Sequence, residues 1–229
     1  EIGTITPLPQ VGNAKPRLHR INKESSIINK LGFPNKGINH LVQKLSKIRK
    51  HHALGTEPII GVNVGCNKTS KKPIDDYIFC LKKIYKLADY VTINISSPNT
   101  PGLRKLQKKE NLIKLLKKIN VERTILEKKF KRTLPLVIKI SPDIESKSLK
   151  KLIEVSIKYK LNGIIATNTT INKHVLSRGQ KKIPDGGISG KPLFKVSNKI
   201  LKQVKLLSKN NLDIIGLGGV DSGETAHQK

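Results

Sequence analysis

The chain has 229 residues, which suits one large domain with a sizeable core, and only 3% of them are aromatic. No apolar run reaches the roughly 18 residues that span a bilayer, and no signal-peptide pattern opens the chain. The net charge is +29, but 38 of the 45 basic residues are Lys. Because these lysines occur in every polar segment and stacking aromatics are scarce, we favour compositional drift over a nucleic-acid partner.

Apolar runs of strand length, bounded by turn residues, predict five β-strands. They cover residues 58–65, 90–97, 134–142, 161–170 and 212–220, and residues 1–6 are typical of the end of a sixth strand. Between these runs, apolar residues three and four apart predict helices at 38–50, 75–88, 112–130, 148–160 and 198–210. The near-continuous Val and Ile of the strands indicate burial on both faces, and hence a parallel sheet.

The alternation of strands and helices leaves two architectures, a (β/α)8 barrel and a doubly wound sheet. A doubly wound sheet concentrates its site at one or two switch points, whereas a barrel collects its site from nearly all strand ends. Here every predicted strand ends in polar residues or glycine, namely Thr4 and Thr6, Asn63, Asn94 and Ser97, Lys139, Thr167, Asn168 and Thr169, and Gly216, Gly218 and Gly219. We therefore predict an α/β fold of the (β/α)8 TIM-barrel type.

One strand end is unusual because Asn94 lies inside an apolar run. A buried amide without a partner would cost several kcal/mol, so we expect a ligand to satisfy it. Pro98 and Pro101 follow shortly after and would restrict a loop that covers that ligand.

Two glycine-rich stretches, residues 185–193 and 216–223, differ from known phosphate motifs. The first has Asp185 where a P-loop requires Gly and Pro192 where it requires Ser or Thr, and the second lacks G-x-G-x-x-G spacing. Each stretch alone could be a simple tight turn. Together, at the late strands of a barrel, they are better explained as a phosphate site built from backbone N–H groups.

The cysteines, the histidines and the absence of methionine limit further what kind of protein this is. Cys66 and Cys80 have no CxxC spacing and no disulfide framework, which fits a reducing cytosol. The six histidines lack metal-ligand spacing, so we predict no metal site. The chain contains no methionine, and we expect it to be an internal piece of a longer protein.

Eight motifs occur in an order that matches a known family. They are EIGTITPLPQVGNAKPRLHR (1–20), INKLGF (28–33), GVNVGCNK (61–68), INISSPNTPGLRKLQ (93–107), VIKISPD (137–143), IIATNTT (164–170), GGISGKPL (186–193) and IIGLGGVDS (214–222). In these motifs the chain resembles the dihydroorotate dehydrogenase family, specifically its quinone-dependent class 2. The resemblance implies that residues 1–229 are an FMN-binding (β/α)8-barrel catalytic domain, truncated at both ends, without its first and eighth strands.

The resemblance also implies an activity. A class 2 enzyme is a flavin-dependent oxidoreductase that oxidises (S)-dihydroorotate to orotate, with FMN as hydride acceptor and quinone as final acceptor, in de novo pyrimidine (UMP) biosynthesis. The N-terminal helical extension that docks class 2 enzymes on the membrane and admits quinone is expected to be missing from this chain. The implied location is peripheral, on the cytoplasmic side of a bacterial inner membrane, with no nucleic-acid partner.

The resemblance assigns roles residue by residue. FMN-contacting positions match Thr4, Asn63, Asn94, Lys139, Thr167, Gly190 and Gly219. Among them, Lys139 would lie by the pyrimidine edge of the flavin and the two glycines at its phosphate. Positions that hold dihydroorotate match Asn29, Lys30, Leu31, Gly32, Phe33, Asn94, Asn99, Asn168 and Thr169. Ser97 matches the catalytic base, and because class 1 enzymes carry Cys there, it favours class 2.

Several alternatives stay open at this point. Pro34 stands where the family usually has Asn, which removes one backbone N–H beside the substrate segment. Singly, Asn63 and Asn94 could brace loops, Lys139 could form a salt bridge and Ser97 could simply end a strand. The chain could also be a noncatalytic basic relic of such a barrel, or a class 1 enzyme linked to fumarate or NAD. The matched set favours the quinone-dependent enzyme.

Overall fold

The main sheet is built from six parallel strands in the part of the chain that the computed structural model describes, residues 1–51, 58–100, 102–177 and 183–229. In spatial order these strands are β1 (Ile2–Ile5), β4 (Gly61–Val64), β5 (Tyr90–Asn94), β6 (Leu136–Ile140), β7 (Gly163–Ala166) and β9 (Asp213–Gly216). Their register places Gly3 beside Asn63 and Asn94 beside Lys139. The carboxyl ends of all six strands therefore meet along one edge of the sheet.

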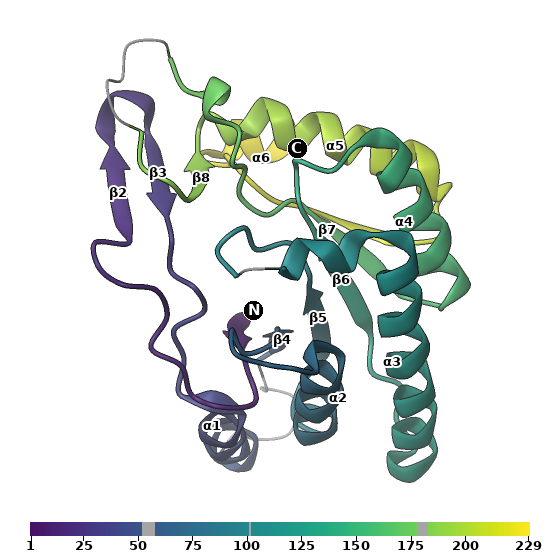
Figure 1. Ribbon diagram of the computed structural model, residues 1–229. Coiled ribbons are helices and arrows are strands. Elements are labelled where there is room, and N and C mark those ends of the chain that lie inside the picture. The colour runs from purple at the N-terminus through teal and green to yellow at the C-terminus, as the bar shows by residue number, and fades with distance from the viewer. Residues whose placement is uncertain (52–57, 101, 178–182) are drawn as a thin grey trace.

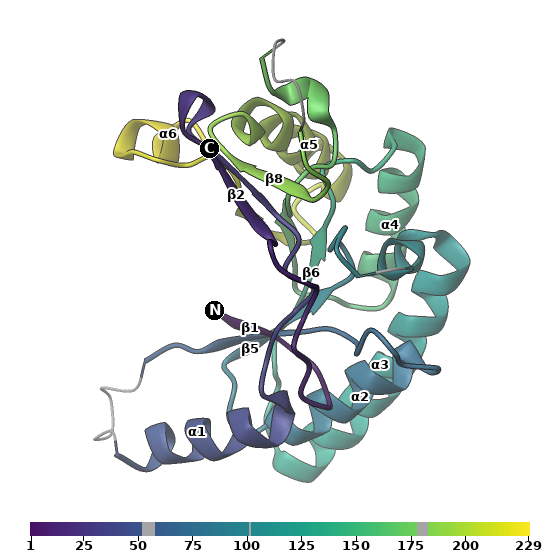
Figure 2. The same cartoon turned by 60° about the vertical axis from the view of Figure 1, so that its left-hand side comes forward.

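Helices follow the strands and cover the outer face of the sheet (Figures 1 and 2). They are α1 (Gly37–His51), α2 (Pro73–Ile84), α3 (Lys109–Phe130), α4 (Ser146–Lys158) and α5 (Leu193–Ser208). The short α6 (Gly223–His227) follows β9 near the end of the chain and has no buried residue. Helix α2 illustrates the local causes, since Pro73 begins it and Asp75 and Asp76 follow in its first turn. A proline is preorganised for the first helical position, and carboxylates there interact favourably with the helix dipole.

The hydrophobic core lies between the sheet and these helices. Val62 and Ile93 on the strands are fully buried, and so are Leu112 and Leu115 on α3. Each such side chain stabilises the fold by about 1.5–3 kcal/mol relative to an exposed one. The parallel sheet was predicted, and the observed helices lie within a few residues of the predicted ones.

A second sheet was not predicted. It is antiparallel, in the order β2-β3-β8, and consists of β2 (Leu18–Ile21), β3 (Ser26–Asn29) and β8 (Gly187–Gly190). The expectation of strict strand–helix alternation is therefore wrong at this point. The sequence pattern did not indicate these strands, because each has only four residues and β2 is largely exposed. Pairing of Asn29 with Gly187 brings distant parts of the chain together.

All five predicted strands end earlier in the structure than predicted. The run expected over 90–97 pairs only to Asn94, and the run expected over 161–170 pairs only to Ala166. Beyond Asn94 the loop turns away through Ser97 and Pro98, and Pro98 cannot donate a ladder hydrogen bond. These residues are therefore free to face the site rather than neighbouring strands.

The cysteines are free and buried in the described part of the chain. Burial, helped by the Asp76 carboxylate, raises the pKa of the Cys66 thiol to about 11, and burial raises the pKa of Cys80 further. Both thiols are therefore protonated near neutral pH. No described helix is long and apolar enough to cross a membrane. No group of three or more His, Cys, Asp or Glu among the described residues could hold a metal ion.

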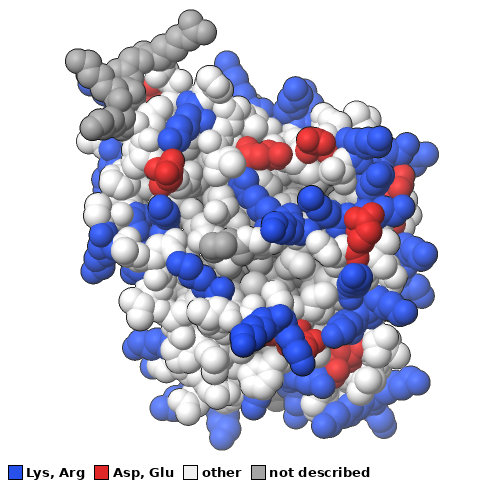
Figure 3. All heavy atoms as spheres, viewed as in Figure 1, with Lys and Arg blue, Asp and Glu red and all other residues white. Residues whose placement is uncertain are grey.

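Basic side chains are spread over the surface. Figure 3 shows Lys and Arg across the whole visible face, with acidic residues among them rather than one separate basic patch. A nucleic-acid groove would gather positive charge along one track. The visible distribution fits the interpretation of these lysines as compositional.

Tyr77 links helix α2 to the end of β5, and it provides a test of how this end is held. The side chain is fully buried, and its hydroxyl donates to the Asn94 carbonyl oxygen at 2.7 Å. Tyr77→Phe should leave that carbonyl without this donor and lower the free energy of unfolding by roughly 1–2 kcal/mol. Urea denaturation followed by circular dichroism measures the loss. The half-buried Tyr159 is a matched control, and equal midpoints for both Phe variants would contradict this role.

Candidate active site

Polar residues from most strand ends line one cavity of about 310 Å³ at the carboxyl edge of the sheet. Twelve residues predicted from the sequence line it, namely Thr4, Asn29, Leu31, Gly32, Phe33, Asn63, Asn94, Ser97, Asn99, Lys139, Asn168 and Thr169. The structure thus brings together segments more than 160 residues apart. Glu1, Gly3, Pro34 and Pro98 complete the lining.

The centre of this lining is a hydrogen-bonded group of Thr4, Asn63 and Asn94. The Asn94 side-chain nitrogen donates to Thr4 Oγ1 at 3.0 Å and to Asn63 Oδ1 at 3.1 Å. Thr4 Oγ1 in turn donates to Asn63 Oδ1 at 2.7 Å, and the Asn94 side-chain oxygen accepts from the backbone and hydroxyl of Ser96. The sequence indicated a ligand as the partner of the Asn94 amide, and in the structure Thr4, Asn63 and Ser96 supply partners for it.

Glu1 adds a carboxylate to this group on the far side of Asn63 from Asn94. Its role was not predicted from the sequence. Its carboxylate accepts from Asn63 Nδ2 at 2.9 Å and from Thr92 Oγ1 at 2.5 Å. The signal was present, since strand alternation puts Glu1 on the same face as Gly3, which pairs with Asn63. Asn63 is thus fixed at both ends of its amide.

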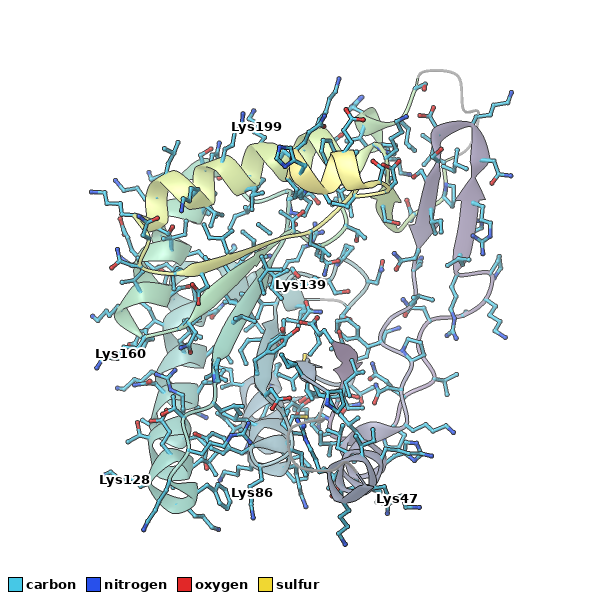
Figure 4. The ribbon with its side chains drawn as sticks, turned by 180° about the vertical axis from the view of Figure 1, so that it is seen from behind. Lys47, Lys86, Lys128, Lys139, Lys160 and Lys199 are labelled. Carbon is cyan, nitrogen blue, oxygen red and sulfur yellow. The ribbon has the colours of Figure 1, made fainter. Side chains whose placement is uncertain are left out.

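Lys139 is the cation of the cavity. Figure 4 shows it in the interior of the molecule, whereas the other labelled lysines lie around the outside. Burial lowers the pKa of Lys139, and the nearby Glu1 carboxylate opposes this shift. The ammonium group is therefore held in the site at a cost that a negatively charged ligand would reduce.

The loop after β5 carries Ser97 into the cavity. The Ser97 side chain is buried, and its hydroxyl oxygen accepts from the backbone N–H of Asn99 at 3.2 Å. Asn99 anchors the loop to β3, because its Nδ2 donates to the Asn29 backbone oxygen at 3.0 Å and side-chain oxygen at 3.1 Å. Pro98 lines the cavity, and Pro101 lies outside the described residues.

The loop after β7 supplies Asn168 and Thr169. Asn168 Nδ2 donates to Ser96 Oγ at 2.9 Å, and Asn168 Oδ1 accepts from the Thr169 backbone N–H at 2.7 Å. Thr167 is buried and does not line the cavity. Its backbone N–H donates to the Leu217 carbonyl oxygen, and its hydroxyl donates to the Asn168 carbonyl oxygen. This loop therefore contacts the Ser97 loop directly.

The segment after β3 closes another side of the cavity. Gly32 adopts a φ of +70° and Phe33 one of +53°, which turns the chain towards the strand ends. The side chain of Gln10 supports this turn by donating to the carbonyls of Gly32 and Phe33. Lys30 departs from its neighbours, because it lines an adjacent cavity that shares Asn99 and Pro98 with the first.

Gly190 and Gly219 lie apart from the first cavity. Gly219 lines a separate hollow of about 1000 Å³ together with Ser25 and Lys191, the residue after Gly190. Both glycines have positive φ, and a Cβ would lie 2.3 Å from the Ser25 carbonyl at Gly190 and 2.6 Å from the Phe194 nitrogen at Gly219. Only glycine fits these close backbone approaches.

The fold and site define a barrel protein of the α/β class, with a polar ligand site at the carboxyl ends of its strands. The dihydroorotate dehydrogenase family model matches residues 1–229. Among curated relatives, "Dihydroorotate dehydrogenase (quinone)" of Aliivibrio fischeri strain MJ11 is 42% identical over the whole chain and 67% of its own length. The protein of that name from Legionella pneumophila strain Lens is 41% identical over the whole chain and 68% of its own length.

Solved structures give the same result. DHODH from Eimeria tenella in complex with ferulenol matches with a TM-score of 0.91 and 34% identity, over 100% of this chain and 65% of that one. The ligand-free form matches with a TM-score of 0.91 and 35% identity, over 99% of this chain and 67% of that one. The chain belongs to the dihydroorotate dehydrogenase family, and the predicted barrel and class 2 resemblance are confirmed. It spans about two thirds of the length of these relatives.

Asn94→Ala tests the central group. The change removes donors to Thr4 and Asn63 and takes away the acceptor of the buried Ser96 N–H and hydroxyl, so the complete protein should lose roughly 2–3 kcal/mol of unfolding free energy. FMN and orotate, the ligands that we propose below for this cavity, should both bind more weakly, because three strand ends lose a common anchor. The fluorescence of released flavin measures the flavin affinity, and a titration with orotate, followed by flavin absorbance, measures the orotate affinity. The half-buried Asn120 on α3 is a matched control, because its side-chain oxygen also accepts a hydrogen bond, from Arg123 at 2.8 Å, and it does not line the cavity. Unchanged affinities in Asn94→Ala would rule out the anchoring role.

Proposed function

We propose that the complete protein oxidises (S)-dihydroorotate to orotate with quinone as final acceptor, in pyrimidine biosynthesis. The curated relatives carry the name of this reaction, and the chain spans about two thirds of their length. The observation that carries the proposal is the buried Ser97 hydroxyl at a cavity lined by asparagine amides and Lys139.

FMN is the cofactor that we propose, and the residues present fit it. Thr4, Asn63 and Asn94 offer hydroxyl and amide groups, and Lys139 offers a cation for the electron-rich ring edge. Thr167 belongs to the same proposed set. Gly219 lines the separate hollow together with Lys191, and backbone N–H groups in glycine-rich turns such as those at Gly190 and Gly219 suit a phosphate. When bound, FMN supplies the acceptor for the hydride that the substrate loses.

Dihydroorotate suits the rest of the lining. It is a flat ring with amide donors, carbonyl acceptors and a carboxylate, and each asparagine side chain can both donate and accept. We assign it to Asn29, Asn94, Asn99 and Asn168, with Thr169 and the segment from Lys30 to Phe33 beside them. Pro34 lines the cavity without a backbone N–H, so the carbonyls and side chains around it must position the substrate.

Ser97 is the proposed base that removes the substrate proton. A serine hydroxyl hardly ionises at neutral pH, so its proton must be passed on and bulk water kept away. We propose that Thr100 or a bound water relays that proton, accepting it while releasing another towards solvent; the Thr100 hydroxyl is buried three residues away and has no hydrogen-bond partner among the described residues. The Asn99 backbone N–H fixes the orientation of the Ser97 oxygen meanwhile.

The remaining parts of the proposal concern the whole protein. We propose that residues 1–229 form one catalytic unit, and that quinone and a membrane surface are reached through residues outside this chain. A peripheral position on the cytoplasmic side of a bacterial inner membrane is consistent with the bacterial relatives.

Ser97→Ala in the complete protein tests the proposed base. The variant should retain FMN and still bind orotate, because the asparagine side chains and Lys139 remain. Flavin reduction by dihydroorotate should slow by roughly 10²–10⁴-fold, the usual contribution of a positioned general base. Ser97→Cys should keep part of the rate and shift its pH dependence lower, because a free thiol ionises near pH 8.5.

Anaerobic stopped-flow measurement of flavin reduction across pH compares the variants. The exposed Ser177 is a matched control, and its Ala variant should reduce flavin at the parent rate. If Ser97→Ala also reduces its flavin at the parent rate, Ser97 is only a turn residue after β5, and the proposed base is wrong. If the parent protein binds FMN but is not reduced by dihydroorotate, the chain is a noncatalytic barrel, and the proposed function is wrong.

A further inference from the structure

Arg104 lies just after the Ser97 loop, in the short 3-10 helix η2 (Leu103–Gln107). Its guanidinium spans three loops. Nε donates to the Ser96 carbonyl at 3.0 Å, one amino group donates to the Thr169 carbonyl at 3.2 Å, and the other pairs with Asp143 Oδ2 at 2.9 Å. One side chain therefore contacts the loops that follow β5, β6 and β7.

Asp143 completes this arrangement from the loop after β6. Besides Arg104, its carboxylate accepts from the Thr170 hydroxyl and from the Ile171 backbone N–H at 3.0 Å. Thr170 and Ile188 exchange backbone hydrogen bonds, so the contact continues to β8 of the small sheet. The side chains of Arg104 and Asp143 are only 23% and 19% exposed.

The geometry of this pair suits fixation rather than simple charge neutralisation. A guanidinium is planar and presents several donors in fixed directions, whereas a lysine ammonium cannot reach three acceptors in the same way. A partly buried pair with additional hydrogen bonds also depends less on salt than an exposed pair. The pair therefore fixes where Ser96 and Thr169 lie relative to each other.

We propose that Arg104 is a positioning residue, which with Asp143 holds the Ser97 loop in register with the Asn168–Thr169 loop. Arg104 does not line the cavity, so it acts through Ser96 and Thr169 rather than on a bound molecule. The expected effect of Arg104 on the reaction rate rests on the proposed function. Its role in fixing the two loops relative to each other does not. Small displacements of a positioned group are costly, since a shift of about 1 Å can slow a reaction by about 10²-fold.

The test compares Arg104→Ala, Arg104→Lys and a matched control in the complete, FMN-loaded protein. Arg132→Ala is the control, because Arg132 also donates to backbone carbonyls, those of Tyr85, Lys86 and Ala88, and also faces a carboxylate, that of Asp89. It follows α3, near the amino-terminal end of the strands. Both alanine variants lose comparable structural contacts, and only Arg104→Ala should disturb the site.

Two readouts separate positioning from general stability. Hydrogen exchange of the segments 96–100 and 168–171 should become about tenfold faster in Arg104→Ala and stay at the parent rate in Arg132→Ala. Flavin reduction by dihydroorotate should slow by roughly 10–100-fold in Arg104→Ala, while orotate affinity changes less. Arg104→Lys should restore neither the parent exchange rate nor the parent reduction rate, because a lysine lacks the planar guanidinium that reaches all three loops.

Each outcome decides a different claim. Parent-like exchange in both segments of Arg104→Ala would overturn the positioning role, whatever the enzyme does. Faster exchange with a parent-like reduction rate would overturn its catalytic consequence. If the parent itself is not reduced by dihydroorotate, the proposed function fails, and the exchange measurement still decides whether Arg104 fixes the loops.

Discussion

The structure depends on satisfying the Asn94 amide, which the parallel sheet buries at the carboxyl end of β5. Left without partners, this group would cost several kcal/mol. Thr4 from β1, Asn63 from β4 and Ser96 from the following loop supply those partners, and Tyr77 from α2 caps the Asn94 carbonyl. Because the partners come from separate elements, one amide fixes the relative positions of several strand ends. The cavity takes its shape from that arrangement.

The charges of the cavity follow from the same packing. Register places Lys139 beside Asn94, and Glu1 accepts hydrogen bonds from Asn63 and Thr92 nearby. The resulting surface combines neutral amides, which can donate and accept, with the half-buried Lys139 ammonium and the Glu1 carboxylate. Such a surface suits a planar ring that hydrogen-bonds along its edges and gains negative charge when reduced. The loops that carry Ser97 and Asn168 then cover it, held by Asn99 on one side and Arg104 on the other.

The sequence predicted the parts of this account that depend on local pattern. Runs such as Gly61–Val64 are apolar enough to indicate buried parallel strands, and polar residues at their ends indicated the site. The antiparallel sheet was beyond reach because β3 and β8 are short and pair across more than 150 residues. The same limit applies to Arg104, whose partners lie in the loops after β5, β6 and β7. The protein partners of Asn94 were missed for this reason too.

The central claim is that this group of amides and Lys139 forms one site for flavin and orotate. A crystal structure of the complete protein with FMN and orotate tests it most directly. The account predicts orotate within hydrogen-bonding distance of Asn94, Asn99 and Asn168, beside the Ser97 hydroxyl, with Lys139 at the flavin. Orotate bound elsewhere, with Asn94 and Asn168 still contacting only protein groups, would contradict it.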